Sequence, residues 1–275
     1  MDGQATSRGH LNPGTVALVH RLLPPPELAD AVVHFWIPEW DLAPGQVSRQ
    51  RVLTYPIVNL VVEPGAAEGD ITAHGPHTAI SHRDLSGRGW AVGALLKPAA
   101  VPTLIAPLTA PALVDNYVCL QGPDLVHEVS HIMGSRQDGC HERAADAVAR
   151  WLRGRLAAAG APDRDGLLAN RLMECVNRAG EAPRRVSDLA TELGTSTRTL
   201  ERVSLAHTGF TPAALIRRRR LQDAADRLRR DAGLDLATLA QEVGYADHAH
   251  LTRDFRTVLG FTPSDYRADA ASDQT

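Results

Sequence analysis

Histidine and cysteine side chains that lie close together in a sequence are candidate metal ligands, and this chain has two such groups. Their members are His74, His77 and His82 in the first group, and His127, His131, Cys140 and His141 in the second. The first group lacks the closely spaced His-x-His and downstream Glu of metal-binding cupins, and the second lacks the paired ligands of a zinc finger. The sequence also has no phosphate-binding loop, dinucleotide fingerprint or nucleophile elbow. We therefore expect no catalytic residue, no metal and no cofactor.

Four consecutive arginines at positions 217–220 could neutralise DNA phosphates, which would make binding weaker as salt rises. On a helix the four side chains point in different directions, so at most one or two of them can face one DNA backbone. The alternative, a solvated helix whose arginines pair with Asp223 or Asp226, is equally well supported. The candidate phosphate contacts are Arg217, Arg218 and Arg256.

The helices that would carry these arginines belong to a duplicated segment. The tetrapeptide Gly-Phe-Thr-Pro occurs at 209–212 and again at 260–263, and upstream of it residues 189–194 match residues 239–244. Each copy has the pattern of a short apolar helix, a glycine, a polar turn and a second helix. The sequence therefore predicts two related helix-turn-helix modules in series.

The repeated tetrapeptide contains residues that end one helix and begin the next. Gly209 and Gly260 suit the left-handed conformation that follows a helix, and the threonines Thr211 and Thr262 can cap the next one. A helix from 212 to about 230 then joins the modules, and with a rise of 1.5 Å per residue it is roughly 28 Å long. Because successive major-groove faces of DNA are about 34 Å apart, both second helices can enter adjacent segments of the groove.

The two modules and their connecting helix resemble the AraC/XylS family of transcription regulators. The resemblance is most specific in the closing segments 244–256 and 260–267. It implies a domain whose second helices read major-groove base edges in double-stranded promoter DNA. The residues implied to do so are Arg198, Thr199, Glu201 and Arg202 in the first module, and His248, Ala249, His250, Thr252 and Arg253 in the second.

The chemistry of several of these side chains independently fits base recognition. Arg202 and Arg253 can each make paired hydrogen bonds to guanine. Glu201 can accept a hydrogen bond from cytosine, and Thr252 can approach a thymine methyl group. The alternative is a solvated helix face with internal ion pairs, such as Arg253 with Asp254. For the arginines the duplicated geometry favours DNA contact, while for the two histidines both interpretations stay open.

The first module departs from the family pattern within its second helix. Ser204 stands where the family usually has a large aromatic residue, and Leu205 and Ala206 replace the usual basic pair. We therefore expect looser packing or fewer phosphate contacts in the first module, and a firmer DNA contact by the second.

The sequence before residue 160 predicts a different architecture. Short runs at 51–55, 57–63, 71–74, 78–82 and 90–96 are partly β-branched and bounded by Pro or Gly, as in an antiparallel sandwich or barrel. From about residue 124 the apolar spacing becomes helical. This region resembles the cupin-like domain attached to some AraC/XylS regulators. The predicted fold class is α+β, with an antiparallel β (cupin-like) domain and trailing helices followed by an all-α domain of two helix-turn-helix modules joined by a linker helix.

The domain boundary is expected at the Gly- and Pro-containing stretch that follows residue 158. The predicted units are a sensor or dimerisation domain with a helical end at 1–160, a linker at 161–166, the DNA-binding domain at 167–268 and a polar tail at 269–275.

A small group of aromatic residues in the amino-terminal domain could line a pocket for a small-molecule effector. They are Trp36, Trp40, Tyr55 and Trp90. Aromatic residues this sparse are more often part of a core, which is the alternative. The resemblance also implies a homodimer, and contact with RNA polymerase if the protein is an activator.

Composition limits the remaining classes of function. The net charge of −3 argues against a uniformly basic nucleic-acid binder, but residues 184–267 hold 14 arginines against 11 acidic residues. No apolar stretch approaches the roughly 20 residues of a membrane span, and the amino terminus lacks the apolar core of a signal peptide. The three cysteines fit reduced thiols, so we expect a cytoplasmic protein with no membrane partner.

Together these patterns predict a sequence-specific DNA-binding transcription regulator, controlled by a small-molecule effector or by dimerisation through its amino-terminal domain. The alternative is a metal-dependent cupin-type enzyme with an accessory DNA-binding tail.

Overall fold

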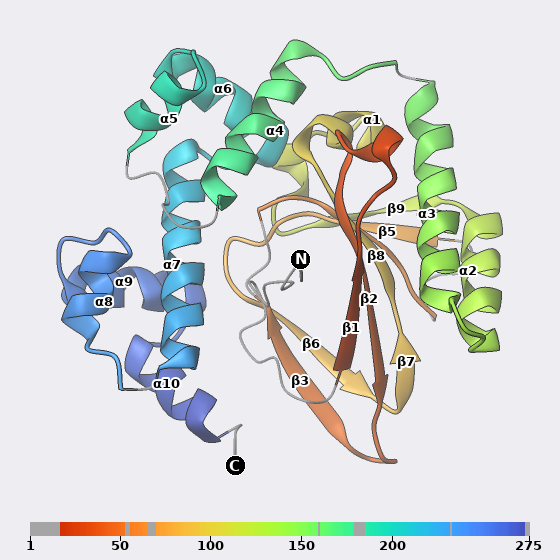
Figure 1. The fold of residues 1–275 in the computed structure, drawn as a ribbon, viewed down its shortest axis with the longest axis horizontal. Helices are drawn as coiled ribbons and strands as arrows, with labels where there is room; N and C mark the ends of the chain where they lie inside the picture. Colours follow the sequence, from red (N-terminus) through yellow and green to blue (C-terminus); the bar gives the residue numbers. More distant parts are fainter. Residues whose placement is uncertain are drawn as a thin grey trace.

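The computed structural model describes residues 17–52, 56–64, 70–158, 160–178, 185–231 and 233–272 of the chain. An antiparallel β region comes first and a helical region follows (Figure 1), so the predicted α+β organisation is confirmed.

The strands of the described residues form two antiparallel sheets. They are β1 (Ala17–Leu22), β2 (Val32–Asp41), β3 (Val47–Val52), β4 (Asn59–Val62), β5 (Asp70–His74), β6 (Ser81–Ser86), β7 (Arg88–Trp90), β8 (Val92–Leu96) and β9 (Tyr117–Gln121). The larger sheet has the order β1-β2-β8-β4-β5-β9, with β7 also paired to β2, whereas β3 and β6 form a separate pair. The ten-residue strand β2 is therefore central, because it pairs with β1, β7 and β8.

Three of these strands, β1, β2 and β9, were not predicted from the sequence. In β2, Pro38 lies inside the strand, and an internal proline normally argues against a strand because it cannot donate a ladder hydrogen bond. Beside Pro38 the pairing to β2 is interrupted at Ala91, between β7 and β8, and there the Pro38 carbonyl accepts a hydrogen bond from the backbone N–H of Ala91 at 3.2 Å. The strand predicted at 78–82 begins only at Ser81, and residues 53–55 of the run at 51–55 lie outside the described residues.

Two helices, α2 (Pro123–Ser135) and α3 (Cys140–Ala157), cover one face of the larger sheet. Val148 and Leu152 of α3 are fully buried in the same apolar cluster as Phe35 and Ile37 of β2. Short helical segments close the edges of this core: η1 (Pro26–Leu28), η2 (Pro98–Ala100), α1 (Val101–Ile105) and η3 (Ala110–Leu113). Burial of these apolar faces, rather than helix propensity, fixes the positions of α2 and α3.

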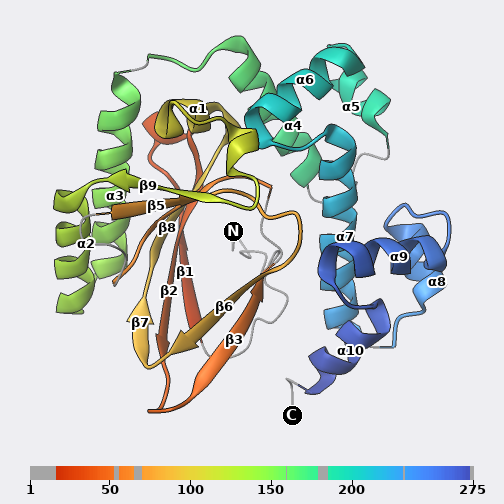
Figure 2. The same ribbon diagram turned by 180° about the vertical axis from the view of Figure 1, so that it is seen from behind.

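The helical region lies on the other side of the sheet from α2 and α3 in both views (Figures 1 and 2). It consists of α4 (Arg164–Asn177), α5 (Val186–Glu192), α6 (Thr197–Thr208), α7 (Pro212–Arg230), α8 (Leu236–Glu242), α9 (His248–Leu259) and α10 (Pro263–Ser272). Helix α4 begins inside the segment 161–166 that the sequence suggested as a linker. Asp163 caps it by accepting a hydrogen bond from the N–H of Gly166 at 2.7 Å.

The β region and the helical region share apolar cores. Ile57 and Leu95 of the β region are buried in one cluster with Leu172 of α4 and Leu215 of α7. Ile80 packs against the cluster around α8, α9 and α10. These contacts place α7 between the β region and the second module.

Polar contacts and one glycine reinforce this packing. Asn170 of α4 accepts a hydrogen bond from the N–H of Ala99 at 2.9 Å and donates one to the carbonyl of Asp30 at 2.8 Å. Gly209 has φ +77°, and a Cβ atom there would come within 2.4 Å of the Val114 side chain. The glycine that ends α6 is thus required both by its own backbone and by the close approach of the β region.

Candidate nucleic-acid interface

The first helix-turn-helix module is formed by α5 and α6. Gly194 follows α5 with φ +64°, and the N–H of Thr195 returns to the carbonyl of Ala190 at 2.9 Å. Ser196 then caps α6, since its hydroxyl accepts a hydrogen bond from the N–H of Thr199 at 3.1 Å. Glycine, left-handed turn and cap thus set the angle at which α6 leaves α5.

The second module repeats this turn with different side chains. Gly244 follows α8 with φ +82°, and the N–H of Tyr245 returns to the carbonyl of Ala240 at 2.8 Å. The cap of α9 is Asp247, whose carboxylate accepts a hydrogen bond from the N–H of His250 at 2.7 Å. The turns of the two modules therefore have the same hydrogen-bond pattern, as their sequence match predicts.

The repeated tetrapeptide also has the predicted conformation. Gly209 and Gly260 are left-handed, with φ +77° and +79°. Thr211 caps α7 through a hydrogen bond from the N–H of Ala214, and the hydroxyl of Thr262 accepts one from the N–H of Asp265. The predicted roles of both glycines and both threonines are confirmed.

The second helix of the first module, α6, has one exposed face. Arg198, Glu201 and Arg202 lie on it, whereas Thr199 is half-buried and contacts the Ser196 hydroxyl at 2.9 Å. Arg202 donates a hydrogen bond to the Asp165 carboxylate of α4 at 2.7 Å, and this bond lowers the pKa of Asp165. The structure thus brings three of the four predicted base-reading residues onto one surface, with one arginine held by an acidic partner.

The second helix of the second module, α9, presents a comparable face. His248, Ala249, His250 and Arg253 are exposed there, and Thr252 is half-buried. Their positions on α9 are compatible with entry of this helix into a groove, as the sequence predicts.

A polar network below this face joins α9 to α7. The Asp254 carboxylate lies 2.8 Å from Arg217 Nε, accepts a hydrogen bond from the Tyr245 hydroxyl at 3.1 Å, and is 4.0 Å from His250 Nε2. Burial and the neighbouring Asp254 raise the pKa of Tyr245, so its hydroxyl remains a donor at neutral pH. The sequence suggested an ion pair between Asp254 and Arg253, but Asp254 instead contacts Arg217, Tyr245 and His250. Arg253 lies on the exposed face of α9.

The departure of the first module at Ser204 has a structural compensation. Ser204 is fully buried at the position equivalent to Phe255 of α9, which is also fully buried. Its hydroxyl donates to the carbonyl of Phe210 at 2.7 Å, and the Thr208 hydroxyl donates to the Ser204 carbonyl at 2.8 Å. The first module therefore has a buried pair of hydrogen-bonded hydroxyl side chains at the place where the second module has an aromatic ring.

Replacing Ser204 with Ala should destabilise the chain by about 1 kcal/mol, because it removes one buried hydrogen bond and leaves the packing otherwise unchanged. Urea unfolding of the wild-type and variant chains measures this. Ser187→Ala, at an exposed position of α5, is the matched control and should have no effect. Equal stabilities of the two variants would show that the Ser204 hydroxyl contributes nothing.

The four arginines at 217–220 point to four different partners. Arg217 pairs with Asp254, and Arg219 pairs with Asp223 at 2.8 Å while donating to the carbonyls of Asn177 and Arg178 at the end of α4. Arg220 lies over the Tyr245 ring, 5.8 Å from its centroid. Only the pairing with Asp223 was anticipated, because the other partners come from distant segments.

Arg218 corrects one of the predicted phosphate contacts. It is 4% exposed, lies over the Phe210 ring and donates to the carbonyl of Thr78 in the β region at 3.4 Å. In this arrangement of the two regions its guanidinium is covered and cannot reach DNA. Arg217 is partly exposed but ion-paired, and Arg256 is exposed on α9, so these two stay candidate phosphate contacts.

The structure separates the aromatic residues suggested for an effector pocket. Trp36 and Trp40 lie on one face of β2, each packed against a glycine of a neighbouring strand, Gly93 and Gly89 respectively. Trp90 lies opposite Glu39 and packs against the core on the other face. Tyr55 lies outside the described residues, so only Trp36 and Trp40 share a surface.

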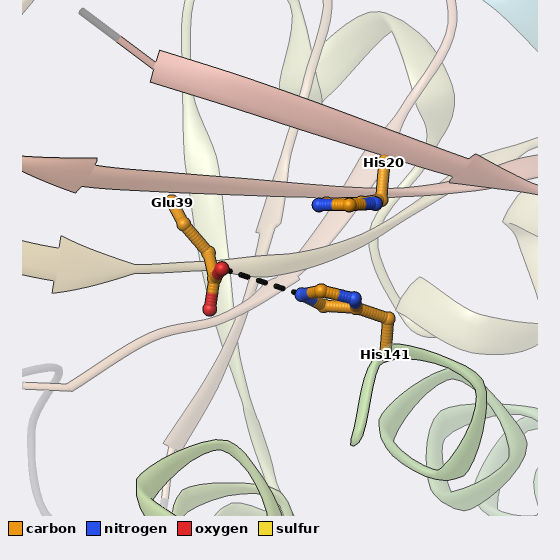
Figure 3. Close-up of side chains that lie close together, drawn as sticks. All are labelled: His20, Glu39 and His141. Carbon is orange, nitrogen blue, oxygen red and sulfur yellow. Dashed lines mark ion pairs between the residues drawn. The ribbon is translucent and has the colours of Figure 1, made fainter. Parts of the chain in front are cut away.

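Neither histidine group from the sequence forms a three-ligand cluster among the described residues. The only such cluster found in that part of the chain is His20, Glu39 and His141 (Figure 3). Sequence reasoning considered His141 but missed the other two, because they belong to β1 and β2, which were not predicted as strands. In the described residues, no helix is long and apolar enough to span a membrane.

Comparisons with known proteins match the two regions separately. Residues 189–269 match a family described as a helix-turn-helix domain, and residues 20–119 match a domain of unknown function, DUF6597. An AraC-like transcription regulator of Streptomyces lividans is 36% identical over 126 residues, which are 46% of this chain and 38% of the relative. The transcriptional activator RhaS of Pectobacterium atrosepticum is 33% identical over 107 residues, which are 39% of this chain and 35% of the relative.

These matches cover less than two fifths of the length of either relative. The crystal structure of ToxT from Vibrio cholerae O395 aligns over 92% of this chain and 96% of its own, with a TM-score of 0.42 and 12% identity. The family match and the two relatives agree with the paired modules α5–α6 and α8–α9. Residues 189–269 of this chain therefore form a helix-turn-helix domain that is similar in sequence to AraC-like transcription regulators.

Proposed function

We propose that this chain is a sequence-specific transcription regulator that binds double-stranded DNA through α6 and α9. The observation that carries the proposal is the duplicated turn geometry, which presents the exposed faces of both helices from one connecting helix, α7. The names of the relatives support the same function. Arginine on each face supplies the side chain that most often reads guanine in the major groove.

The first module needs one rearrangement to read a base. Arg202 holds Asp165 in the structure, and because both side chains are substantially exposed the ion pair contributes little stability. A guanine edge can therefore replace the carboxylate at small cost. On α9, Arg253 does not have to leave an acidic partner in the same way. The neighbouring Asp254 carboxylate is already held by Arg217 and Tyr245.

Control by the amino-terminal region is the finer part of the proposal. The apolar clusters shared by the β region with α4 and α7 give a route by which a ligand or a second copy could alter the modules. A small-molecule effector on the face of Trp36 and Trp40 would raise the melting temperature of the chain in a thermal-shift screen.

The DNA-binding proposal is tested with the purified chain and the DNA upstream of its own gene. Footprinting should reveal an asymmetric site that spans two major-groove segments, and the affinity should fall as salt rises. Equal affinity for this DNA and for random duplex at every salt concentration would overturn the proposal.

Replacing Arg253 with Ala should weaken specific binding by roughly 5- to 150-fold, corresponding to about 1–3 kcal/mol for a lost bidentate base contact. Discrimination at one base pair should relax, whereas the salt dependence should hardly change. Fluorescence anisotropy on the footprinted site and on single-base variants measures both effects. Arg150→Ala is the control, since Arg150 is exposed on α3 and pairs with Glu128. An unchanged affinity of the Arg253 variant would remove this residue from the site.

A further inference from the structure

The cluster of His20, Glu39 and His141 brings together three secondary-structure elements. His20 comes from β1, Glu39 from β2 and His141 from the first turn of α3. In Figure 3 both imidazole rings extend towards the Glu39 carboxylate. The three residues are 19 and 102 positions apart in sequence, so only the fold makes them neighbours.

The register of the sheet explains why their side chains meet. His20 lies opposite Ile37, and Glu39 lies two residues further along β2, so all three side chains are on the same face. Ile37 is fully buried in the cluster that includes α3. His20 and Glu39 therefore lie beside the buried apolar face, at the point where α3 begins at Cys140.

The atoms already have distances close to those of a coordination site. His141 Nε2 is 3.3 Å from a Glu39 carboxylate oxygen, and the two imidazole rings stack with centroids 3.8 Å apart and planes 20° from parallel. One ligand atom from each residue lies within 4.8 Å of the other two. His141 Nε2 is buried and faces the Glu39 carboxylate without forming a hydrogen bond of good geometry, so a metal ion placed between them would give this nitrogen a bonded partner.

We propose that His20, Glu39 and His141 bind a divalent transition-metal ion, with Zn²⁺ as the best fit. Two imidazole nitrogens and one carboxylate oxygen are a common ligand set for Zn²⁺, with a water molecule in the fourth position. Bonds of about 2.0–2.2 Å in tetrahedral geometry put ligand atoms roughly 3.3–3.5 Å apart. Glu39 and His141 already satisfy this, and His20 needs to approach by at most about 1.5 Å. Glu39 is 40% exposed, so solvent can supply the fourth ligand.

The bound ion would join α3 to β1 and β2 and so stabilise the packing of that helix on the sheet. Because the ion binds only the folded chain, saturation at about 100 times the dissociation constant should raise the melting temperature by about 5–10 °C. This site is on the helix-covered face of the sheet, whereas the proposed DNA contacts are on α6 and α9. Its test therefore does not depend on the proposed DNA binding.

The experiment uses the full-length chain without a histidine tag, treated with a chelator and then dialysed. Titration with ZnCl₂, followed by calorimetry and by elemental analysis after gel filtration, should give one ion per chain. Titration with CoCl₂ should give the visible absorption of tetrahedral Co²⁺. Each of His20→Gln, Glu39→Gln and His141→Gln should weaken Zn²⁺ binding at least ~10-fold and abolish the rise in melting temperature.

The control variant is His127→Gln/His131→Gln, because this pair on α2 is spaced to bind a metal by itself. It should bind Zn²⁺ like the wild-type chain. If this variant loses the ion, or if Glu39→Gln binds it with unchanged affinity, the proposed site is wrong. If a histidine variant does not fold, Glu39→Gln is the deciding variant, because the Glu39 side chain is more exposed than that of His141 (40% against 20%). If the wild-type chain binds no Zn²⁺, the proposal is wrong, and the cluster is only an ion pair between Glu39 and His141 with the His20 ring stacked beside it.

Discussion

Replacing Arg218 with Glu is expected to destabilise the folded chain by about 3–5 kcal/mol, the cost of leaving an uncompensated charge buried. Arg218 is 4% exposed, and burial lowers its pKa to about 10, so it is still charged at neutral pH. Its charge is favoured by Asp115, and its guanidinium donates to the carbonyl of Thr78. A carboxylate in its place would meet that carbonyl and the Asp115 carboxylate, and both would repel it.

The same substitution should loosen the contact between the β region and α7. Urea unfolding measures the loss of stability, and hydrogen exchange around residues 76–80 and 110–115 measures the exposure of the interface. Arg230→Glu is the matched control, because Arg230 is on the last turn of the same helix with its side chain 67% exposed. Arg218→Met removes the charge but keeps most of the volume, and should be close to wild type. Equal stability of the Arg218→Glu and Arg230→Glu variants would contradict this account of the interface.

Acid should destabilise the amino-terminal region through His34 of β2. Burial, together with the neighbouring Arg21, lowers the pKa of His34 from 6.5 to about 4. Above pH 6.5 His34 is neutral in both the folded and the unfolded chain and has no effect. Between pH 6.5 and pH 4 the unfolded chain takes up the proton first, so stability is lost as the pH falls. The loss is about 2 kcal/mol at pH 5 and approaches about 3 kcal/mol below pH 4.

The variant His34→Gln isolates this contribution, because glutamine stays neutral over the whole range. Urea unfolding at pH 7, 5 and 4 should show a smaller loss of stability for the variant than for the wild type, by the amounts given above. His131→Gln, at an exposed position of α2, should keep the full pH dependence. Parallel pH profiles for all three chains would show that His34 takes up its proton equally well in the folded state.

The helix-turn-helix modules could be predicted from the sequence because their determinants are local. Gly194 and Gly244 permit the left-handed turn, and Gly209 and Gly260 end the second helices. Each cap and turn is a contact between residues at most five positions apart, so residue types in order are enough to specify it. The apolar positions of α5, α6, α8 and α9 then follow from helical periodicity.

The strands β1, β2 and β9 could not be found in this way. Their burial depends on which strands pair. The internal Pro38 is accommodated where the pairing to β2 is interrupted between β7 and β8, which the sequence of β2 alone does not show. The partners of Arg218 and Arg219 are likewise distant, since Thr78 and Asn177 reach α7 only after the β region and α4 have packed. Composition cannot show that an arginine will be buried rather than bind a phosphate.

The sequence by itself determined the paired modules and the connecting helix, because these depend on contacts within one turn or one helix face. The candidate base-reading residues came from the resemblance to AraC/XylS regulators and stay a prediction. Only the tertiary structure decided that Arg218 is enclosed between the two regions, that Trp90 lies on the opposite face from Trp36, and that His20, Glu39 and His141 meet. The physical reason is that long-range contacts are selected by burial of shared apolar surface, which the order of residues does not display.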